Sequence, residues 1–190
     1  MELFGRQGYH ATTIAQIEAA AGLSAGAGGL YRHFPSKRAL LEEALRRQAD
    51  QTRPLLDYLQ DPAALAGLPQ RARFLAVARA GLRRLAEERD INRLLLSDLA
   101  TFPDLLELVR VQELGRVHEA LTAWLRREDG DGRLDHAAYA AVLIAAVAHY
   151  WTLADVFDGK HPHVDEERFL NALADLATGT FPSPGPPSAR

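Results

Sequence analysis

Ser24 lies within a five-residue pattern that could perform chemistry. Gly22-Leu23-Ser24-Ala25-Gly26 matches G-x-S-x-G, in which a serine on a sharp strand-to-helix turn acts as a nucleophile. The residues before Gly22 follow a helical pattern, and no strand is predicted that would present the serine. We therefore interpret Ser24 as a helix N-cap, and we expect no catalytic site and no enzymatic activity.

Two further patterns resemble ligand-binding loops but lack required residues. The glycines of segment 26–29 are followed by no Lys-Ser/Thr pair and preceded by no strand, so neither a P-loop nor a dinucleotide site is predicted. The segment from Asp129 begins like a calcium-binding loop. However, Arg133 stands at its fifth position and Ala140 at its twelfth, where oxygen ligands are needed. We interpret this segment as an acidic turn.

A third cluster has the residue types of a metal site, namely His161, His163, Asp165 and Glu166. We favour an exposed loop followed by a helix that begins with acidic residues, because acids stabilise a helix N-terminus. The chain has no cysteine, which excludes disulfides and thiolate ligands. No metal and no cofactor are predicted.

The composition is that of a globular protein with unevenly distributed charge. Of 190 residues, 47% are hydrophobic and 25% are charged, which predicts one or two small domains with a buried core. The formal net charge is −3. The window Gly5–Leu41 nevertheless has four basic residues and one acidic residue, a net of +3, whereas the residues after it have 18 basic and 23 acidic, a net of −5. A basic head of this kind suits contact with phosphate.

Apolar residues recur at every third and fourth position, which predicts helices throughout and an all-α fold. Thr13 and Gln16 fit a capping box at the start of a helix that ends at Gly22. Ser24 is expected to begin the next helix, Phe34-Pro35 to end it, and Ser36 to begin another, which Pro54 kinks or ends. Further helices are expected over residues 74–85, 92–99, 103–128, 136–157 and 165–178. In two of them the apolar spacing predicts inward-facing residues: Leu114, Val117, Leu121, Trp124 and Leu125 in 103–128, and Phe169, Leu170, Leu173, Leu176 and Ala177 in 165–178.

The helix expected over residues 136–157 contains twelve consecutive apolar residues, Ala137–Ala148, most of them alanine. A membrane-spanning helix needs about 20 strongly apolar residues, so we expect a buried or subunit-interface helix and no membrane contact. The first residues show no secretion signal, and a cytoplasmic protein is expected. The proline-rich residues from Pro182 onward are expected to be disordered.

The first two expected helices are joined by the turn Gly22-Leu23-Ser24 and predict a helix-turn-helix, whose second helix enters the major groove of DNA. Tyr31 and His33, followed by Lys37 at the start of the next helix, would contact phosphate oxygens. Apolar side chains of the same segment would form a three-helix core: Leu3, Phe4, Ile14, Ile17, Leu23, Leu30 and Phe34.

The DNA-binding head of TetR-family bacterial repressors resembles the segment LFGRQGYHATTIAQIEAAAGLS…LYRHFPSKRALL. Matching positions include Gly8-Tyr9, Thr12-Thr13, Ala21-Gly22-Leu23-Ser24 and the run Leu30–Lys37. The match covers about the first 45 residues, and the remainder is similar to the family in helix number, helix length and apolar character.

The resemblance implies DNA-binding roles for nine residues of this chain. The phosphate contacts of the family match Thr13, Tyr31, His33 and Lys37. The base-reading positions match the segment Ser24–Gly29, of which we select Ser24, Ala25, Gly26, Ala27 and Gly28.

The head departs from the family pattern in three places. Glu18 stands where the family favours alanine, and the segment between Ser24 and Tyr31 is two residues longer than the commonest family spacing. That segment has three glycines, each of which costs about 1 kcal/mol of helix relative to alanine, so its helix is expected to be short or ordered only on DNA. It has no Arg, Asn or Gln, so contacts to thymine methyls and DNA shape would supply the readout. The first helix begins nearly at Met1, about ten residues later than is usual in the family. Either the start is misassigned, or the head has a short first helix and weaker phosphate binding.

The resemblance also implies a homodimer that binds a palindromic DNA operator with half-sites ~34 Å apart or slightly more. Helices 136–157 and 165–178 would form its four-helix interface. A small-molecule inducer would bind in each C-terminal domain and release DNA through the helix that begins at Ser36. The pocket candidates are aromatic and polar residues, each equally well explained as a core residue: Trp124, His149, Tyr150, Trp151 and Asp155.

The sequence therefore predicts a helix-turn-helix DNA-binding domain over residues 1–45, a helical ligand-binding and dimerisation domain over 46–180, and a tail over 181–190. The predicted function is a ligand-responsive DNA-binding transcriptional regulator, a repressor released from its operator by an inducer. The alternative is a helical dimeric module that binds a ligand or protein and has lost specific DNA binding. The glycine-rich segment and the short first helix favour that alternative.

Overall fold

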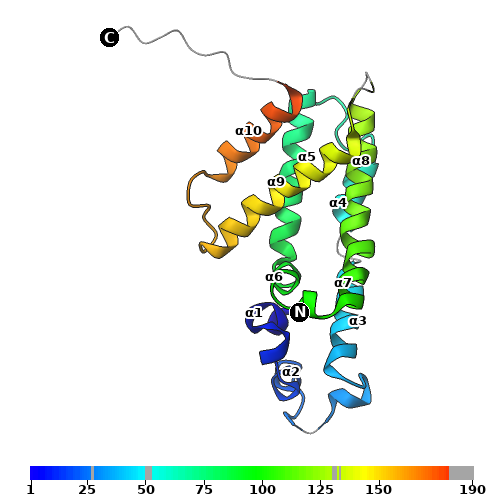
Figure 1. The fold of residues 1–190 in the computed structure, drawn as a ribbon, viewed down its shortest axis with the longest axis vertical. Coiled ribbons are helices and arrows are strands. Elements are labelled where there is room, and N and C mark those ends of the chain that lie inside the picture. Colours follow the sequence, from blue (N-terminus) through cyan, green and yellow to red (C-terminus); the bar gives the residue numbers. More distant parts are fainter. Residues whose placement is uncertain (27, 50–52, 130–131, 133, 180–190) are drawn as a thin grey trace, which may run out of the picture. The chain divides into compact units, whose positions relative to one another are not determined.

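A computed structural model describes residues 1–26, 28–49, 53–129, 132 and 134–179 of the chain. The candidate residue Ala27 and the predicted tail 181–190 lie outside the described residues. Within the described ranges the secondary structure is helical without a strand, which confirms the all-α prediction (Figure 1).

The helices follow one another along the chain with short connections. Their bounds are α1 Glu2–Ala11, α2 Ile14–Ala20, α3 Lys37–Ala49, α4 Arg53–Gln60, α5 Gln70–Glu87, α6 Arg89–Ser97, α7 Pro103–Val109, α8 Arg116–Glu128, α9 His136–Val156 and α10 Glu166–Thr178. Short 3-10 turns cover Leu30–Arg32 and Leu99–Thr101, and a π-helical turn covers Arg110–Gly115.

The chain forms two compact units. The first comprises Met1–Gln60 and Arg84–Leu121, and the second comprises Asp61–Arg83 and Thr122–Arg190. One boundary lies directly after α4, and the other two fall inside α5 and α8. The predicted domain boundary between residues 45 and 46 falls inside α3, which belongs to the first unit, and that boundary stays a prediction.

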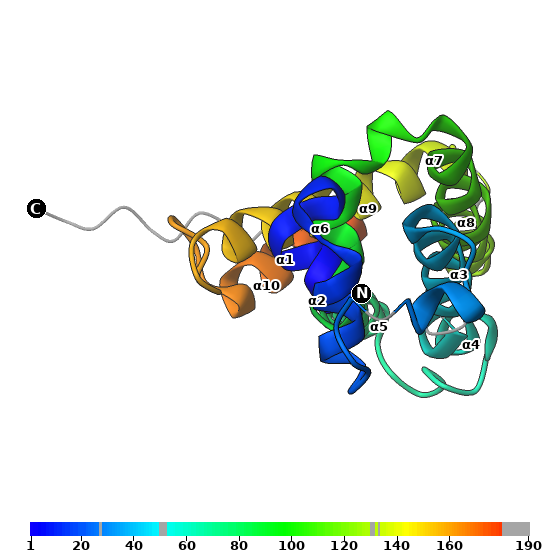
Figure 2. The ribbon, with the colours of Figure 1, turned by 90° about the horizontal axis from the view of Figure 1, so that it is seen from below.

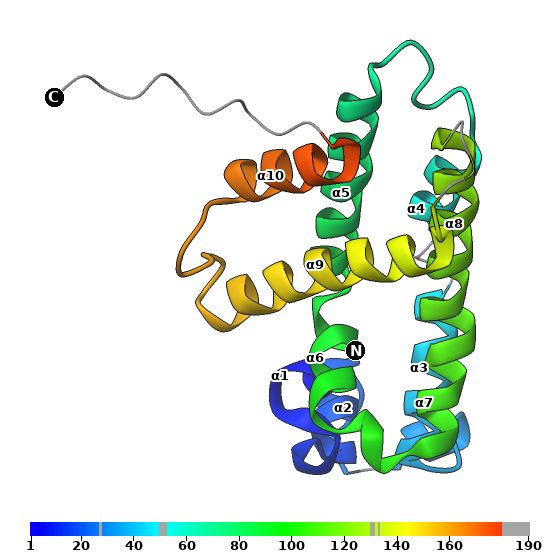
Figure 3. The same ribbon diagram turned by 45° about the horizontal axis from the view of Figure 1, so that its top comes forward.

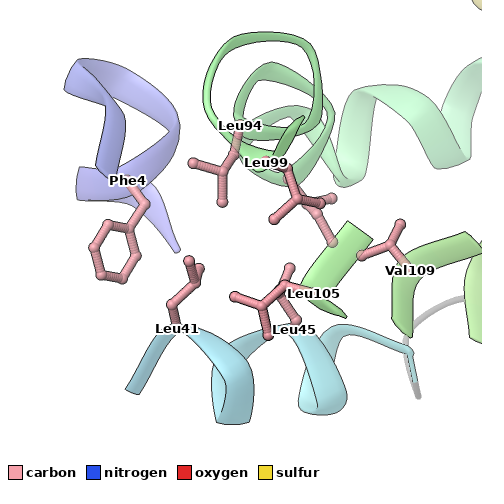
Figure 4. Close-up of a cluster of buried hydrophobic side chains, with 8 residues drawn as sticks. Phe4, Leu41, Leu45, Leu94, Leu99, Leu105 and Val109 are labelled. Carbon is pink, nitrogen blue, oxygen red and sulfur yellow. The ribbon is translucent and has the colours of Figure 1, made fainter. Parts of the chain in front are cut away.

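The core of the first unit joins the N-terminal helices to α6 and α7. Figure 4 shows Phe4 of α1 facing leucines from α3 and from the α6–α7 region. The buried side chains of this cluster are Phe4, Leu41, Leu45, Ile91, Leu94, Leu99, Leu105 and Val109. Since none of them is more than 6% exposed, the N-terminal head and α6 share one hydrophobic core.

α1 packs closely on α6, and Figure 2 shows the two helices one against the other. A Cβ atom on Gly5 would lie 2.4 Å from the Cα of Asp90, so the backbones meet where α1 has no side chain. α1 is interrupted at Gly8, whose φ is 82° and ψ is 165°. The Asp98 carboxylate accepts a hydrogen bond from the Tyr9 amide at 2.9 Å, which satisfies the backbone at this break.

The predicted long helix from Pro103 to Glu128 is formed by α7, the π-helical turn Arg110–Gly115 and α8 in direct succession. Hydrogen bonds from residue i to i+5 change the angular spacing of side chains within such a turn. Leu114, which lies inside the turn and was expected to face inward, is 45% exposed, whereas Val117, Leu121 and Trp124, which follow the turn, are buried as predicted.

The second unit contains the helical hairpin of α9 and α10, which run side by side in opposite directions (Figures 1 and 3). Tyr150 of α9 stacks on Phe169 of α10 at 4.2 Å between ring centroids. Phe74 of α5 packs edge-on against Trp124 of α8 at 4.8 Å. The predicted helices 136–157 and 165–178 are confirmed within one residue at either end. Leu176, expected to be buried, is 60% exposed.

The break in α1 predicts that alanine is tolerated less well at Gly8 than at Gly22, which also has a positive φ (73°). At Gly22 nothing lies within 4 Å of a new Cβ, whereas at Gly8 the Asp98 carboxylate lies 2.6 Å away. We expect Gly22→Ala to lower the free energy of unfolding by about 1–2 kcal/mol and Gly8→Ala by at least about 3 kcal/mol in urea titrations. Equal losses for the two variants would contradict the close packing at Asp98.

Candidate nucleic-acid interface

α2 begins with the predicted capping box. The Thr13 hydroxyl accepts a hydrogen bond from the Gln16 amide at 3.2 Å, and the Gln16 side-chain oxygen accepts one from the Thr13 amide at 2.8 Å. The helix ends at Ala20, and Gly22 follows with the left-handed backbone that was expected of a helix end. Thr13 is exposed at the start of α2.

The described residues 24–26 and 28–29 do not form the helix that was expected to begin at Ser24, and the expectation that this helix becomes ordered only on DNA stays a prediction. These residues form turns, and the regular structure before α3 is the 3-10 turn Leu30–Arg32. Gly26 and Gly28 have φ values of 76° and 70°. A right-handed helix requires negative φ, so both glycines interrupt it. We call the described residues 24–26 and 28–33 the reading segment.

Glu18 holds the reading segment in place. It is fully buried (0% exposed), and its two carboxylate oxygens accept hydrogen bonds from the Gly26 amide at 2.7 Å and from the Leu30 amide at 3.1 Å. Sequence reasoning noted Glu18 as a departure from the family pattern but gave it no role. A charged residue on the inner face of a short helix, next to a glycine-rich segment, was the available signal.

The reading segment presents most of its predicted DNA-binding residues to solvent. Tyr31 is 54% exposed. His33, Ser24, Ala25 and Gly26 are also exposed, and Gly28 is half-buried beneath the Tyr31 ring. The Tyr31 hydroxyl and a ring N–H of His33, on either side of Arg32, can donate hydrogen bonds to phosphate oxygens.

Lys37, predicted to contact phosphate, has intramolecular partners. Its ammonium group donates hydrogen bonds to the carbonyl oxygens of Tyr9 at 2.7 Å and Thr12 at 2.8 Å. It also lies 4.2 Å from the centroid of the Tyr9 ring. Both carbonyls belong to the end of α1 and the turn after it, where a helix leaves acceptors unsatisfied. Lys37 therefore braces α1 against α3.

Two further groups of ion pairs lie in the first unit, one at Arg38 and one at Arg84. Arg38 forms an ion pair with Asp104, and this hydrogen bond lowers the pKa of the Asp104 carboxyl. Burial raises the pKa of the Tyr9 hydroxyl, and the Arg38 charge lowers it to a smaller extent. Arg84 is paired with Glu88 at 2.8 Å and with Glu113 at 3.0 Å, and all three side chains are nearly buried.

The five pocket candidates occupy different environments in the second unit. Trp124, Tyr150 and Trp151 are buried, Asp155 is half-buried and His149 is exposed. Tyr150 is packed between aromatic rings, and its hydroxyl donates to the Val164 carbonyl at 3.3 Å. Burial raises the pKa of that hydroxyl.

An open cleft of about 350 Å³ lies elsewhere in the second unit. Its lining includes Phe74, Leu125, Tyr139 and Thr178, which come from α5, α8, α9 and α10. The candidate Trp124 contacts the lining residue Phe74, and none of the five candidates lines the cleft. The lining residues gave no sequence signal because they are widely separated along the chain.

The histidine loop is organised by stacking and capping. The His161 ring stacks on Tyr150 at 4.8 Å, and its Nδ1 accepts hydrogen bonds from the amides of His163 and Val164. Asp165 caps α10 by accepting from the Arg168 amide at 2.9 Å, as the loop interpretation predicted. In the described ranges, no three His, Cys, Asp or Glu side chains are placed to hold a metal ion together.

Comparison with known proteins identifies the head. Residues 1–44 match the family model for bacterial regulatory proteins of the tetR family. No curated protein matches the chain. The sequence resemblance to the TetR family is thereby confirmed over the head.

Solved structures show that the similarity of fold extends over the whole chain. A TetR transcriptional regulator from Legionella pneumophila has a TM-score of 0.68 at 18% identity, with 95% of this chain and 92% of that chain covered. GusR from Salmonella enterica has a TM-score of 0.65 at 22% identity, with 94% and 89% covered. FadR from Bacillus subtilis, solved with stearoyl-CoA, has a TM-score of 0.68 at 15% identity, with 95% and 94% covered. The chain has the fold of TetR transcriptional regulators.

The partners of Lys37 predict that its replacement weakens the fold. We expect Lys37→Gln to lower the free energy of unfolding by about 1–2 kcal/mol, because charge-assisted hydrogen bonds to two carbonyls are lost. The matched control is Arg32→Gln, an exposed basic residue whose loss should cost less than about 0.5 kcal/mol. Urea titration of both variants measures the difference. Unchanged stability of Lys37→Gln, with weakened DNA binding, would make the side chain a phosphate contact instead.

Proposed function

We propose that the chain is a homodimeric, ligand-responsive transcriptional regulator that binds a palindromic DNA operator and acts as a repressor released by a small-molecule inducer. The observation that carries this proposal is the match of residues 1–44 to the tetR family, on a head whose reading segment faces solvent. The net charge of +3 over Gly5–Leu41 supports contact with phosphate.

Exposed apolar side chains on α9 and α10 support dimerisation. Val142, Val156 and Leu176 are 65%, 66% and 60% exposed. α9 has a mean hydropathy of 1.5 over an 18-residue window, and 22% of that window is buried within the chain. By length and composition α9 could cross a membrane, but one such helix is weak evidence for a membrane protein. An apolar surface of this kind marks an interaction site, and we propose that a second copy of the chain covers it.

The inducer is proposed to bind in the second unit. The FadR neighbour was solved with stearoyl-CoA, a ligand reported for that protein. In this chain the cleft lined by Phe74, Leu125 and Tyr139 provides apolar and aromatic walls for a small molecule. The five residues chosen from the sequence remain candidates for further contacts: Trp124, His149, Tyr150, Trp151 and Asp155. Inducer binding that weakens operator binding requires a coupling free energy, typically about 1–3 kcal/mol. A cytoplasmic location follows from this proposal.

A second candidate function is supported by the conformation of the reading segment. A helix-turn-helix reads bases from its second helix, and the described residues 24–26 and 28–29 are not helical. A helical dimer that binds a ligand or protein without specific DNA binding would account for this conformation.

A DNA titration decides between the two functions. Fluorescence anisotropy with a duplex from the promoter region of the chain's own gene, compared with a scrambled duplex, should show at least about 10³-fold preference. Affinity should fall steeply between two salt concentrations because phosphate contacts release counterions. Tyr31→Ala should weaken the specific complex, whereas Leu68→Ala, at an exposed position in the loop before α5, should leave it unchanged. Equal affinity for both duplexes would favour the second candidate.

The dimer proposal predicts that a charge on α9 separates the subunits. Val142→Asp should shift the chain from dimer to monomer in sedimentation velocity and weaken operator binding, because a buried unpaired charge is costly at an interface. The matched control is Val111→Asp, a 51%-exposed position in the first unit, which should leave the dimer intact. A Val142→Asp variant that remains dimeric would place the interface elsewhere.

A further inference from the structure

We propose that Glu18 is the positioning residue that fixes the reading segment and thereby sets DNA specificity, an inference that rests on the proposed DNA-binding function. Glu18 forms hydrogen bonds through both its backbone carbonyl and its side chain. Its backbone carbonyl accepts from the amides of Ala21 at 3.1 Å and Leu23 at 2.8 Å, which closes α2. Its carboxylate then accepts from Gly26 and Leu30, so one residue joins the end of α2 to both ends of the glycine-rich turn.

The two amides need this carboxylate because the turn supplies no helical acceptor for them. The Leu30 amide is buried, and a buried amide without an acceptor destabilises the conformation that contains it. Among the described residues no ion pair is formed by Glu18, so the amide dipoles balance its charge. The carboxylate is fully buried, so it is not available to contact DNA directly.

The Glu18 carboxylate fills the space beneath the reading segment. A Cβ atom on Gly29 would lie 4.0 Å from Glu18 Oε1 and 3.7 Å from the Leu23 side chain, so the carboxylate occupies the volume directly under the turn. Gly26 and Gly28 supply the positive φ values of the turn in which the Gly26 amide donates to this carboxylate. The acid at position 18 and the longer, glycine-rich segment are both departures from the TetR-family pattern. In this chain the two departures are joined by hydrogen bonds.

The hydrogen-bonded arrangement of Glu18 and the turn gives a mechanism for specificity without a recognition helix. The turn presents Ser24 and Ala25, and the 3-10 turn after it presents Tyr31, in a conformation fixed before DNA arrives. Preorganised contacts lose less conformational entropy on binding than a segment that must first become ordered. Sequence-independent phosphate binding depends on basic side chains instead, and it should not require Glu18.

The test compares Glu18→Ala and Glu18→Gln with the control Glu2→Gln, an exposed acid whose change alters the net charge by the same amount. Each protein is titrated with the promoter duplex and the scrambled duplex at one salt concentration. Hydrogen exchange of the Gly26 and Leu30 amides is followed by NMR on the full chain, and circular dichroism monitors helix content.

We expect Glu18→Ala to weaken specific binding at least about tenfold, because two amides lose a charged acceptor, while scrambled-duplex binding changes less than about threefold. Exchange at Gly26 and Leu30 should accelerate. Glu18→Gln retains one acceptor and should lie between Glu18→Ala and wild type, and it decides the question if Glu18→Ala does not fold. Glu2→Gln should match wild type in both the specificity ratio and amide exchange.

An unchanged ratio of specific to non-specific affinity, with both amides still protected, would overturn the role of Glu18. If wild-type protein itself prefers neither duplex, the proposed function fails. Amide exchange then decides separately whether Glu18 positions the segment, since that measurement requires no DNA.

Discussion

Charged side chains that bond to backbone groups hold the head together, and the buried carboxylate of Glu18 is the interaction on which the reading segment depends. Lys37 donates hydrogen bonds to one carbonyl at the end of α1 and one just after it. Asp98 accepts a hydrogen bond from the Tyr9 amide at the break in α1. Short helices leave a large share of their backbone groups unpaired at their ends, and a small head has few apolar residues to offset that cost. Each of these three side chains therefore supplies both a hydrogen-bond partner and a fixed geometry.

The same packing connects the head to α6. The backbones of α1 and α6 approach at Gly5, where a side chain would not fit, and Phe4 enters a core shared with Leu94. Asp98, directly after α6, bonds to the head without an intervening flexible loop. A displacement of α6 would therefore move α1 with it, because closely packed interiors transmit strain. This arrangement provides a physical route by which an event in the helical body could reach the DNA-binding surface.

Much of the fold could be predicted from the sequence because local signals determine it. The capping box at Thr13, the serine before α3 and the apolar stripes of α5 and α10 mark helices that the structure confirms. The described residues after Ser24 form a turn, because positive φ at Gly26 and Gly28 and the carboxylate of Glu18 favour it. The pattern could assign Lys37 to phosphate, which stays a prediction, but it could not show which carbonyls lie near the ammonium group. The exposure of Leu114 depends on a π turn that helical periodicity does not encode.

The most direct test of the account is to map DNA contacts on the full chain by NMR, with a promoter duplex and a scrambled duplex of equal length. We expect the promoter duplex to shift selectively the amide signals of Thr13, Ser24, Tyr31 and His33, and the Leu30 amide to stay protected by Glu18. The scrambled duplex should produce small shifts that salt abolishes. Identical shifts with both duplexes, or shifts confined to residues outside the head, would contradict the claim that this segment reads DNA.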